Sequence, residues 1–209
     1  MNLYHTINFG RYWEGTEMNA LPIEWLILEE YEACYFAVSK QAIISKMFDE
    51  ISGKWEESSI RNWLNNEFIE LAFNSSERAC LVSREIISKN DPYLTWGGKN
   101  TIPAIRAVKT IDRVFLLSTD EVEKFFKTKQ SRIIEFSKYA IDTLMGEKDL
   151  MGIWWLRNEE ELGCGPVRIL SDGFYDGENN LGDGDPDKVV GIRPAIYIKK
   201  DCLGQRKNK

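Results

Sequence analysis

The spacing of apolar residues changes along this chain, and this change constrains the fold more than any other feature. Residues 23–28 place alternate side chains on one face of a strand, a polar break follows, and residues 34–38 resume an apolar run, which predicts a hairpin. In residues 58–73 the apolar side chains recur at steps of three and four, which predicts a helix capped by Ser58 or Ser59. This succession of strands and helices in separate blocks is typical of α+β domains.

The second half of the chain repeats this mixture. Residues 114–117 predict a buried strand, and residues 118–121 form a capping box that begins another helix. The chain then returns to strands, which we expect at residues 152–156, 167–170 and 189–199. Two segments rich in glycine, proline, asparagine or aspartate, residues 88–110 and 172–187, are expected to be loops, and long loops in compact domains often carry function.

Length and charge limit the possible architectures and partners. A chain of 209 residues can bury a large core without disulfides, and we expect one domain over residues 1–200 followed by a frayed basic tail at residues 201–209. The formal net charge of -6 repels a phosphate backbone, so we expect no nucleic-acid partner. No run approaches the roughly 20 apolar residues of a membrane span, so we expect no membrane partner either.

The cysteines are spread widely along the chain. Cys34, Cys80, Cys164 and Cys202 form no C-x-x-C pair, which argues against a zinc knuckle and against a thioredoxin-type motif. The first residues show no signal-peptide pattern. We therefore expect reduced thiols that act as small buried hydrophobic side chains in a cytoplasmic protein.

The chain offers few groups for nucleophilic or phosphate chemistry. Its only histidine, His5, lies near the start, where a firmly held catalytic base is not expected. The glycine-rich stretches at residues 96–99 and 163–165 lack the spacing and the strand-to-helix context of a phosphate-binding loop. These features argue against a Ser-His-Asp or Cys-His enzyme and against a nucleotide enzyme.

The most acidic loop contains several aspartates that could ligate a hard cation such as calcium, which prefers six to eight oxygen ligands. The candidate metal ligands are Asp172, Asp176, Asp183, Asp185 and Asp187. The spacing is not that of an EF-hand, because Lys188 stands where the invariant glycine should be. Asp-Gly pairs also form ordinary turns, and this interpretation is favoured, so no cofactor is expected and calcium remains the alternative.

Several short patterns occur in one order between residues 7 and 198. They include EWLIL at residues 24–28, WEESSIRNWLN at 55–65, FLLS at 115–118 with Glu121, WWLR at 154–157 and IRPA at 192–195. In this combination the chain resembles a family of uncharacterised bacterial domains of unknown function. That family is in turn similar to the C-type-lectin-like superfamily, which includes the formylglycine-generating enzymes and sugar lectins.

The resemblance implies a C-type-lectin-like fold. In such a fold the N- and C-terminal strands pair, two helices pack on a mixed sheet, and a long irregular loop region lies on the other side. Two departures are visible, since Ile192 replaces the usual valine and Asn158 with a run of glutamates follows Arg157 in place of a Ser-Pro pair. The copper site of the formylglycine-generating enzymes is not expected, because the surroundings of Cys164 and Cys202 do not match its motif.

Aromatic and arginine side chains in these patterns have two possible roles. A guanidinium that stacks on an indole is favourable, and it can either stabilise the fold or contact a ligand. We favour a structural role for Trp63, Trp155, Arg157 and Arg193. In this hypothesis Arg193 is partly buried, is satisfied by backbone carbonyls or by a carboxylate such as Glu24, and sets the register of the last strand.

Three functional hypotheses follow from the sequence. The favoured one is a non-catalytic binding module that presents its irregular loops to a protein, peptide or glycan, because loop aromatics suit such surfaces. Its candidate ligand-binding residues are Tyr93, Trp96, Phe174, Tyr175 and Asp176. The alternatives are a hydrolase that uses carboxylates of the 172–187 loop, with or without a metal, and an accessory domain whose role is association.

Overall fold

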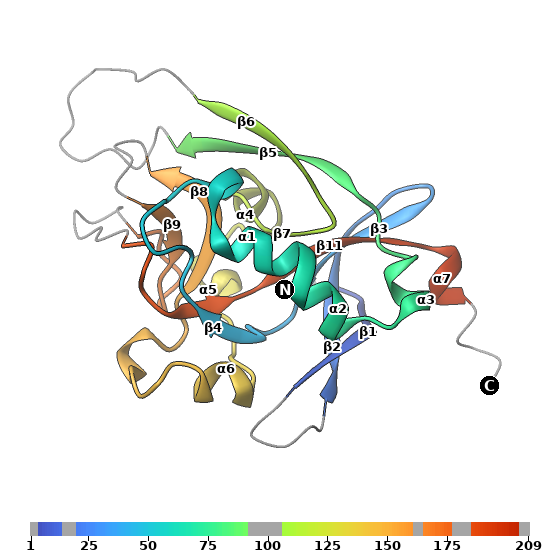
Figure 1. Ribbon diagram of the computed structural model, residues 1–209, viewed down its shortest axis with the longest axis horizontal. Coiled ribbons are helices and arrows are strands. Elements are labelled where there is room, and N and C mark those ends of the chain that lie inside the picture. Colours follow the sequence, from blue (N-terminus) through green and yellow to red (C-terminus); the bar gives the residue numbers. More distant parts are fainter. Residues whose placement is uncertain (1–3, 14–19, 92–105, 161–164, 177–184, 205–209) are drawn as a thin grey trace.

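Two β-sheets carry the fold, and short helices lie around them (Figure 1). The structure is a computed structural model that describes residues 4–13, 20–91, 106–160, 165–176 and 185–204. Strands and helices alternate in blocks along the chain, so the α+β class expected from the apolar spacing is confirmed.

The first sheet is antiparallel and has the order β1-β2-β3-β11-β7. Its strands are β1 (Thr6–Trp13), β2 (Ala20–Glu30), β3 (Cys34–Ser39), β11 (Pro194–Lys199) and β7 (Val114–Leu116). The predicted hairpin is β2–β3. The prediction that the first and last strands pair directly is wrong, because β11 lies between β3 and β7. Both β3 and β11 are almost entirely buried, so each requires a neighbouring strand on both edges.

The second sheet is mixed and has the order β4-β10-β8-β5-β6, with β9 paired to β8. Its strands are β4 (Ile44–Lys46), β10 (Val190–Ile192), β8 (Trp154–Glu160), β5 (Arg84–Asp91), β6 (Ala107–Asp112) and β9 (Pro166–Ile169). Strand β8 runs parallel to β10 and to β5. Because only Arg193 separates β10 from β11, the chain passes from the second sheet to the first at this residue.

The paired strands β5 and β6 form a long ribbon at one side of the molecule (Figure 1). They occupy residues 88–91 and 107–110, so the prediction of a loop was wrong at both of its ends. Pairing over six register positions, from Arg84 with Asp112 to Lys89 with Ala107, outweighs the turn-forming residues there. The central part, which contains Tyr93 and Trp96, lies outside the described residues.

The helical segment predicted for residues 58–73 is present, with a π-helical turn in its middle. It consists of α1 (Ser59–Trp63), the π turn (Leu64–Phe68) and α2 (Ile69–Ala72). The Ser58 hydroxyl caps it by accepting a hydrogen bond from the backbone N–H of Arg61. The other helices are α3 (Ser75–Arg78), α4 (Thr119–Phe125), α5 (Lys129–Arg132), α6 (Lys138–Asp142) and α7 (Asp201–Gly204), and 3-10 turns span Trp55–Glu57 and Lys148–Leu150.

Aromatic side chains fill the core between the sheets and the helices. Phe36 stacks on Tyr197 with ring centroids 4.8 Å apart, and Phe115 lies beside both rings. Large rings in such offset contacts add to the free energy gained from burying their area. The largest fully buried aromatic side chains are Trp25, Trp55, Trp154, Trp155, Phe9, Phe36, Phe48, Phe68, Phe73 and Phe115.

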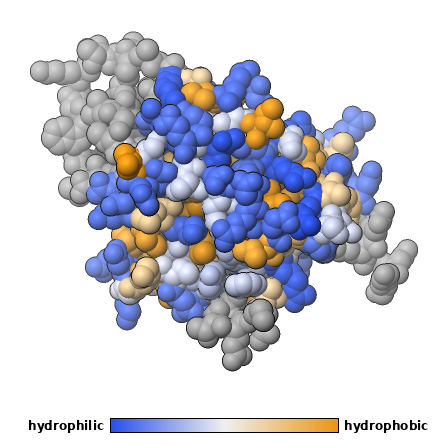
Figure 2. Space-filling view, viewed as in Figure 1, coloured by the Kyte–Doolittle hydropathy of each residue, from blue (hydrophilic) through white to orange (hydrophobic). Residues whose placement is uncertain are grey.

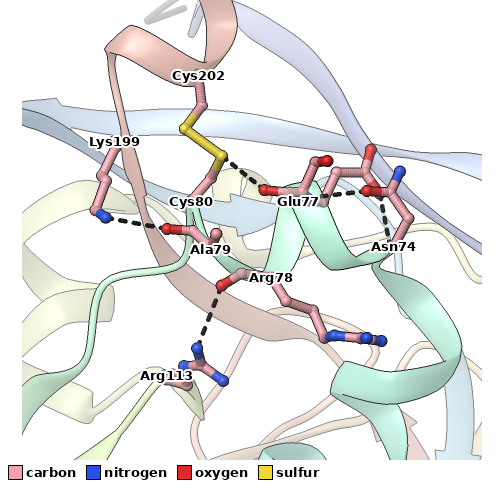
Figure 3. The surroundings of a disulfide bond; sticks show 9 residues. Asn74, Glu77, Arg78, Ala79, Cys80, Arg113, Lys199 and Cys202 are labelled. Atoms are coloured by element: carbon pink, nitrogen blue, oxygen red, sulfur yellow. Dashed lines mark hydrogen bonds between the residues drawn. A yellow bond between two sulfur atoms is a disulfide. The ribbon is translucent and has the colours of Figure 1, made fainter.

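A disulfide joins Cys80 to Cys202 across 122 residues of sequence (Figure 3). It attaches α7, which follows the last strand, to the segment after α3, and the backbone N–H of Lys199 donates to the Cys80 carbonyl beside it. The prediction of reduced thiols is therefore wrong for these two cysteines. Cys34 is free and buried, and Cys164 lies outside the described residues. Sequence spacing could not show the pairing, because β11 brings the two cysteines together only in the folded chain.

The surface mixes polar and apolar residues. On the face in Figure 2, apolar residues form small separate areas among charged ones. Scattered exposed apolar side chains are ordinary for a protein surface. Within the part of the chain that the structure describes, no helix has the length and apolar character needed to cross a membrane.

Candidate functional site

The acidic loop forms turns over the residues that the structure describes. An Asp172 carboxylate oxygen accepts a hydrogen bond from the backbone N–H of Phe174, and Gly173 between them has a φ of 84°. A Cβ at Gly173 would lie 2.2 Å from the Lys129 carbonyl oxygen, so glycine is required there. The Lys129 ammonium covers the ring of Phe174. Asp172 therefore has the role of a turn-forming residue.

Tyr175 and Asp176 lie inside the protein. Tyr175 is 5% exposed and the Arg132 guanidinium lies 4.4 Å from its ring centre, while Asp176 is 4% exposed. The Asp176 carboxylate accepts from Nε of Arg168 at 2.7 Å, and Arg168 also lies over the ring of Trp155. This burial assigns Tyr175 and Asp176 to the core rather than to a surface that contacts a ligand, which corrects the expectation from the sequence.

Two of the three remaining metal candidates lie in the part of the chain that the structure describes. Asp185 and Asp187 are exposed, and Asp183 lies outside the described residues. Among the residues that the structure describes, no group of three or more histidine, cysteine, aspartate or glutamate side chains is arranged to hold a metal.

Replacing Asp176 by asparagine should lower the free energy of unfolding by about 3 kcal/mol, because it removes the buried carboxylate to which the Arg168 guanidinium donates. Urea denaturation followed by circular dichroism would measure the change. Asp185→Asn is the matched control, since Asp185 is exposed, and it should change stability by less than about 0.5 kcal/mol. Equal stability of the two variants would show that Asp176 has no structural role.

Arg157 connects the second sheet to the helix that follows β7. Its Nη1 donates to a Glu121 carboxylate oxygen at 2.6 Å and to the Leu116 carbonyl at 2.7 Å. Glu121 also accepts from the backbone N–H of Ser118, within the capping box of α4. Strand β8, strand β7 and helix α4 are thus held together by one buried guanidinium. The structural role of Arg157 stays our prediction.

Arg193 is buried at the point where the chain passes between the sheets. It is 1% exposed, and its guanidinium lies between the rings of Phe126 and Trp154, with centroid distances of 4.7 and 5.0 Å. Its Nε donates to the Ser39 carbonyl at 2.9 Å, so of the two kinds of partner that we expected it has a backbone carbonyl, while Glu24 pairs with Lys40. Burial lowers the pKa of Arg193 to about 9, so the guanidinium stays charged at neutral pH.

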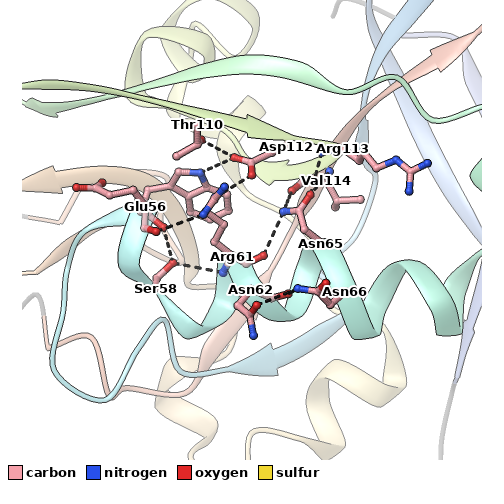
Figure 4. A network of polar contacts seen from close by, with 11 residues as sticks. Glu56, Ser58, Arg61, Asn62, Asn65, Asn66, Thr110, Asp112, Arg113 and Val114 are labelled. Carbon is pink, nitrogen blue, oxygen red and sulfur yellow. Dashed lines mark hydrogen bonds and ion pairs between the residues drawn. The ribbon is translucent and has the colours of Figure 1, made fainter.

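Sequence reasoning missed a second buried polar centre, on Asp112 (Figure 4). The Asp112 carboxylate is fully buried and accepts from Trp55 Nε1 at 2.9 Å, from the Thr110 hydroxyl at 2.6 Å and from Arg61 Nε at 2.8 Å. These bonds attach the β5–β6 ribbon to the start of α1. No local pattern indicates such a centre, because its members come from two distant segments of the chain, residues 55–61 and 110–112.

An ionic cluster lies near the ends of β6 and β8. Arg106 pairs with both Glu56 and Glu159, and burial raises the pKa of the Glu159 carboxyl. A pair of carboxylates with one raised pKa could suit acid–base catalysis. Here the two carboxylates share one guanidinium, so both are engaged in ion pairing rather than presented to a substrate.

The clearest concave site lies on the first sheet, where β1 and β2 meet the segment after β3. We call it the β1–β2 groove, and its cavity volume is about 320 Å³. Its lining residues are Asn8, Tyr12, Trp13, Leu21, Pro22, Ile23, Glu24, Ser39, Lys40, Gln41, Ile43 and Ser137. This volume lies at the lower end of the range for sites that bind small molecules.

A bulge in β1 presents Trp13 to the groove. The register of β1 with β2 shifts between Asn8 and Arg11, where Gly10 has a φ of 70°. Phe9 is buried, so strict alternation would bury residue 13 and expose Tyr12. The extra residue of the bulge exchanges the two faces of the strand beyond it. Tyr12 is therefore buried, whereas Trp13 is 40% exposed. A Cβ at Gly10 would lie 2.5 Å from the ring of Phe73, so the bulge requires glycine.

Polar side chains also line the groove. Lys40 Nζ lies 2.8 Å from a Glu24 carboxylate oxygen, and Asn8 stands opposite Glu24 in the strand register. The hydrogen bond from Lys40 lowers the pKa of the Glu24 carboxyl. Burial raises the pKa of the Tyr12 phenol, which therefore stays neutral. The groove thus offers the exposed indole of Trp13 and several hydrogen-bonding groups. The two charged groups among them, Glu24 and Lys40, neutralise each other.

A second depression lies between β4, α1 and α6. We call it the α6 hollow, and its volume is about 590 Å³. Its lining residues are Ile44, Ser45, Lys46, Met47, Ser59, Trp63, Tyr139, Asp142, Thr143, Met145 and Val189. Trp63, which we assigned a structural role from the sequence, is 8% exposed and lies in its wall.

Comparison with known proteins assigns most of the chain to one family. A family model described as "Domain of unknown function (DUF6273)" matches residues 24–200. No curated protein and no solved structure matches the chain. The matched range begins within β2 and ends directly after β11, so it includes Glu24, Lys40 and Arg193.

Proposed function

The chain belongs to the family of the domain of unknown function DUF6273, and we propose that it is a non-catalytic module that binds a neutral glycan in the β1–β2 groove. The observation that carries this proposal is that the exposed indole of Trp13 and the Glu24–Lys40 ion pair line one groove. A sugar ring has an apolar face that covers an indole and equatorial hydroxyls that bond to carboxylate, amide and ammonium groups. The groove supplies these partners within one cavity.

The charge of the lining supports a neutral ligand. Glu24 and Lys40 are the charged side chains among the described lining residues, and they pair with each other. An acidic ligand would meet the Glu24 carboxylate, and a basic ligand would meet the Lys40 ammonium. Uncharged hydroxyl groups can bond to both without disturbing the pair.

The same lining supports binding rather than hydrolysis. Most glycoside hydrolases place two carboxylates on either side of the scissile bond, with the pKa of the acid raised. Among the described lining residues Glu24 is the one carboxylate, and its pKa is lowered by Lys40. A carboxyl group with a lowered pKa is a poor proton donor at neutral pH.

The disulfide favours one kind of cellular compartment for such a module. Disulfides persist in oxidising surroundings, and the Cys80–Cys202 bond supports an oxidising compartment in place of the cytoplasm that we expected from the cysteine spacing. Glycans on cell surfaces and in secreted material are ligands of such a compartment.

We propose in addition that the fold is C-type-lectin-like. The WWLR strand β8 pairs in parallel with β10, and β10 continues through Arg193 into β11, an interior strand of the other sheet. The first strand lies in the same sheet as the last. These features support the resemblance that the sequence patterns indicated, with the modification that β2 and β3 stand between the first strand and the last.

Substituting Trp13 by alanine should weaken glycan binding by about 2 kcal/mol, or roughly thirtyfold, because the stacking surface is lost. A glycan array and a peptide array would first identify the ligand, and isothermal titration calorimetry would then measure Kd. Tyr31→Ala is the matched control, since Tyr31 is also 40% exposed and does not line the groove. Ligands found on the peptide array alone would contradict the proposal, as would equal Kd values for the two variants.

Binding should keep its strength from pH 8 down to about pH 5. The pKa of Glu24 lies below the usual glutamate value of about 4.3, so the carboxylate stays charged throughout this window. Affinity should fall only at lower pH, as Glu24 takes up a proton. Calorimetric titrations across pH, repeated with Glu24→Gln, would test this, and a loss of affinity already between pH 7 and pH 5 would show that another group controls binding.

A further inference from the structure

The β1–β2 groove and the α6 hollow meet at a shared aromatic wall. Tyr12 lines the groove, and its ring centroid lies 5.7 Å from that of Tyr139 and 6.3 Å from that of Trp63, both of which line the hollow. The consecutive residues Ile43 and Ile44 belong to the groove and to the hollow respectively. The two depressions are therefore neighbours on either side of one cluster of rings.

The hollow has the same kind of chemistry as the groove. Lys46 and Asp142 give it one positive and one negative charge, and Lys46 Nζ lies 5.2 Å from the ring centre of Trp63. Met47 and Met145 add exposed thioether side chains, which adapt their shape to a surface that they contact. A neutral ligand with apolar faces fits this lining as it fits the groove.

Met145 is held at the rim of the hollow in an unfavourable backbone conformation. Its φ of 53° makes it the one non-glycine residue with positive φ in the part of the chain that the structure describes. Glycine or asparagine adopts this conformation more readily, and yet a methionine that is 85% exposed stands there. Strained residues of this kind often occur at ligand-binding positions.

We propose that the ligand is a linear oligosaccharide that occupies both depressions, with one segment on Trp13 in the groove and another on Trp63, Tyr139 and Met145 in the hollow. The proposal rests on the proposed glycan binding. It adds that affinity depends on chain length, because a disaccharide fills the groove alone whereas a longer chain crosses the Tyr12–Tyr139 contact and reaches Met145.

The test compares a disaccharide with the hexasaccharide of the same neutral sugar, taken from the best ligand on the glycan array. Calorimetry on the wild type should give a Kd for the hexasaccharide about tenfold lower than for the disaccharide. Met145→Gly should remove this difference by weakening only the hexasaccharide. Glycine suits the positive φ, so a thermal melt should show the variant fully folded.

Met151→Ala is the control, because Met151 is 51% exposed and lines neither depression, and it should leave both Kd values unchanged. Equal affinity of the wild type for the two sugars would overturn the extended site and leave glycan binding in the groove intact. An unchanged hexasaccharide Kd in Met145→Gly would overturn it as well. Binding of neither sugar would contradict both this inference and the proposed function.

Discussion

Replacing Cys202 by serine should lower the free energy of unfolding by about 2–5 kcal/mol, because the Cys80–Cys202 bond closes a loop of 122 residues in the unfolded chain. The loss of α7 from its place beside α3 should accompany it. Thermal melts with and without a reductant would measure the effect: reductant should bring the wild type to the level of the variant and leave the variant unchanged.

Cys34→Ala is the control for this experiment. Cys34 is the free, buried cysteine among the described residues, so its replacement removes a thiol and leaves the bond. This variant should keep the response to reductant that Cys202→Ser loses. Identical melts of the wild type in oxidising and reducing buffer, with Cys80 and Cys202 both open to alkylation under denaturing conditions without reductant, would contradict the disulfide.

Replacing Arg193 by alanine should cost about 3 kcal/mol of stability and lower Tm by roughly 6–12 °C. The change leaves a cavity between Phe126 and Trp154 and removes the donor to the Ser39 carbonyl. Because Ser39 lines the β1–β2 groove, the guanidinium also supports the floor of the candidate site. Differential scanning calorimetry would measure the loss.

Arg84→Ala is the matched arginine variant. Arg84 also stacks on an aromatic ring, with its guanidinium 5.0 Å from the ring centre of Tyr197, but it is exposed. Its replacement should therefore cost less than about 1 kcal/mol. An Arg193→Ala protein that melts like the wild type and fails to bind glycan would assign Arg193 to the ligand rather than to the fold.

Local patterns in the sequence predicted those parts of the fold that local forces determine. The hairpin of β2 and β3, the helical segment after Ser58 and the start of α4 at its capping box all follow from side-chain spacing and from hydrogen bonds between near neighbours. Local sequence sets where these elements begin, and packing against the rest of the chain stabilises them.

Long-range pairing determined what the sequence could not predict. Strand β11 lies between β3 and β7 because both of its edges need partners, and β5 and β6 extend into residues with turn-forming character because they pair with each other. Tyr175 and Asp176 have the composition of a ligand-binding loop, but Tyr175 is buried against Arg132 and Asp176 against Arg168 of β9. The disulfide depends in the same way on where β11 ends.

The groove was missed for a related reason. Its residues lie on ordinary strands, and the exposure of Trp13 depends on a bulge at Gly10 that reverses the alternation of β1. The signal that could have found it is the glycine between the buried Phe9 and the aromatic pair at residues 12–13, since an isolated glycine in a strand often marks a bulge.

Nuclear magnetic resonance of the tryptophan side chains tests glycan binding in the groove most directly. Each of the seven tryptophans has an indole N–H signal, and the signal absent from Trp13→Ala identifies Trp13. On titration with the best neutral oligosaccharide from the array, we expect the Trp13 signal to shift most, with the backbone signals of Glu24 and Lys40 moving beside it. A Trp13 signal that stays in place while residues 172–176 shift would contradict the groove and return the binding site to the acidic loop.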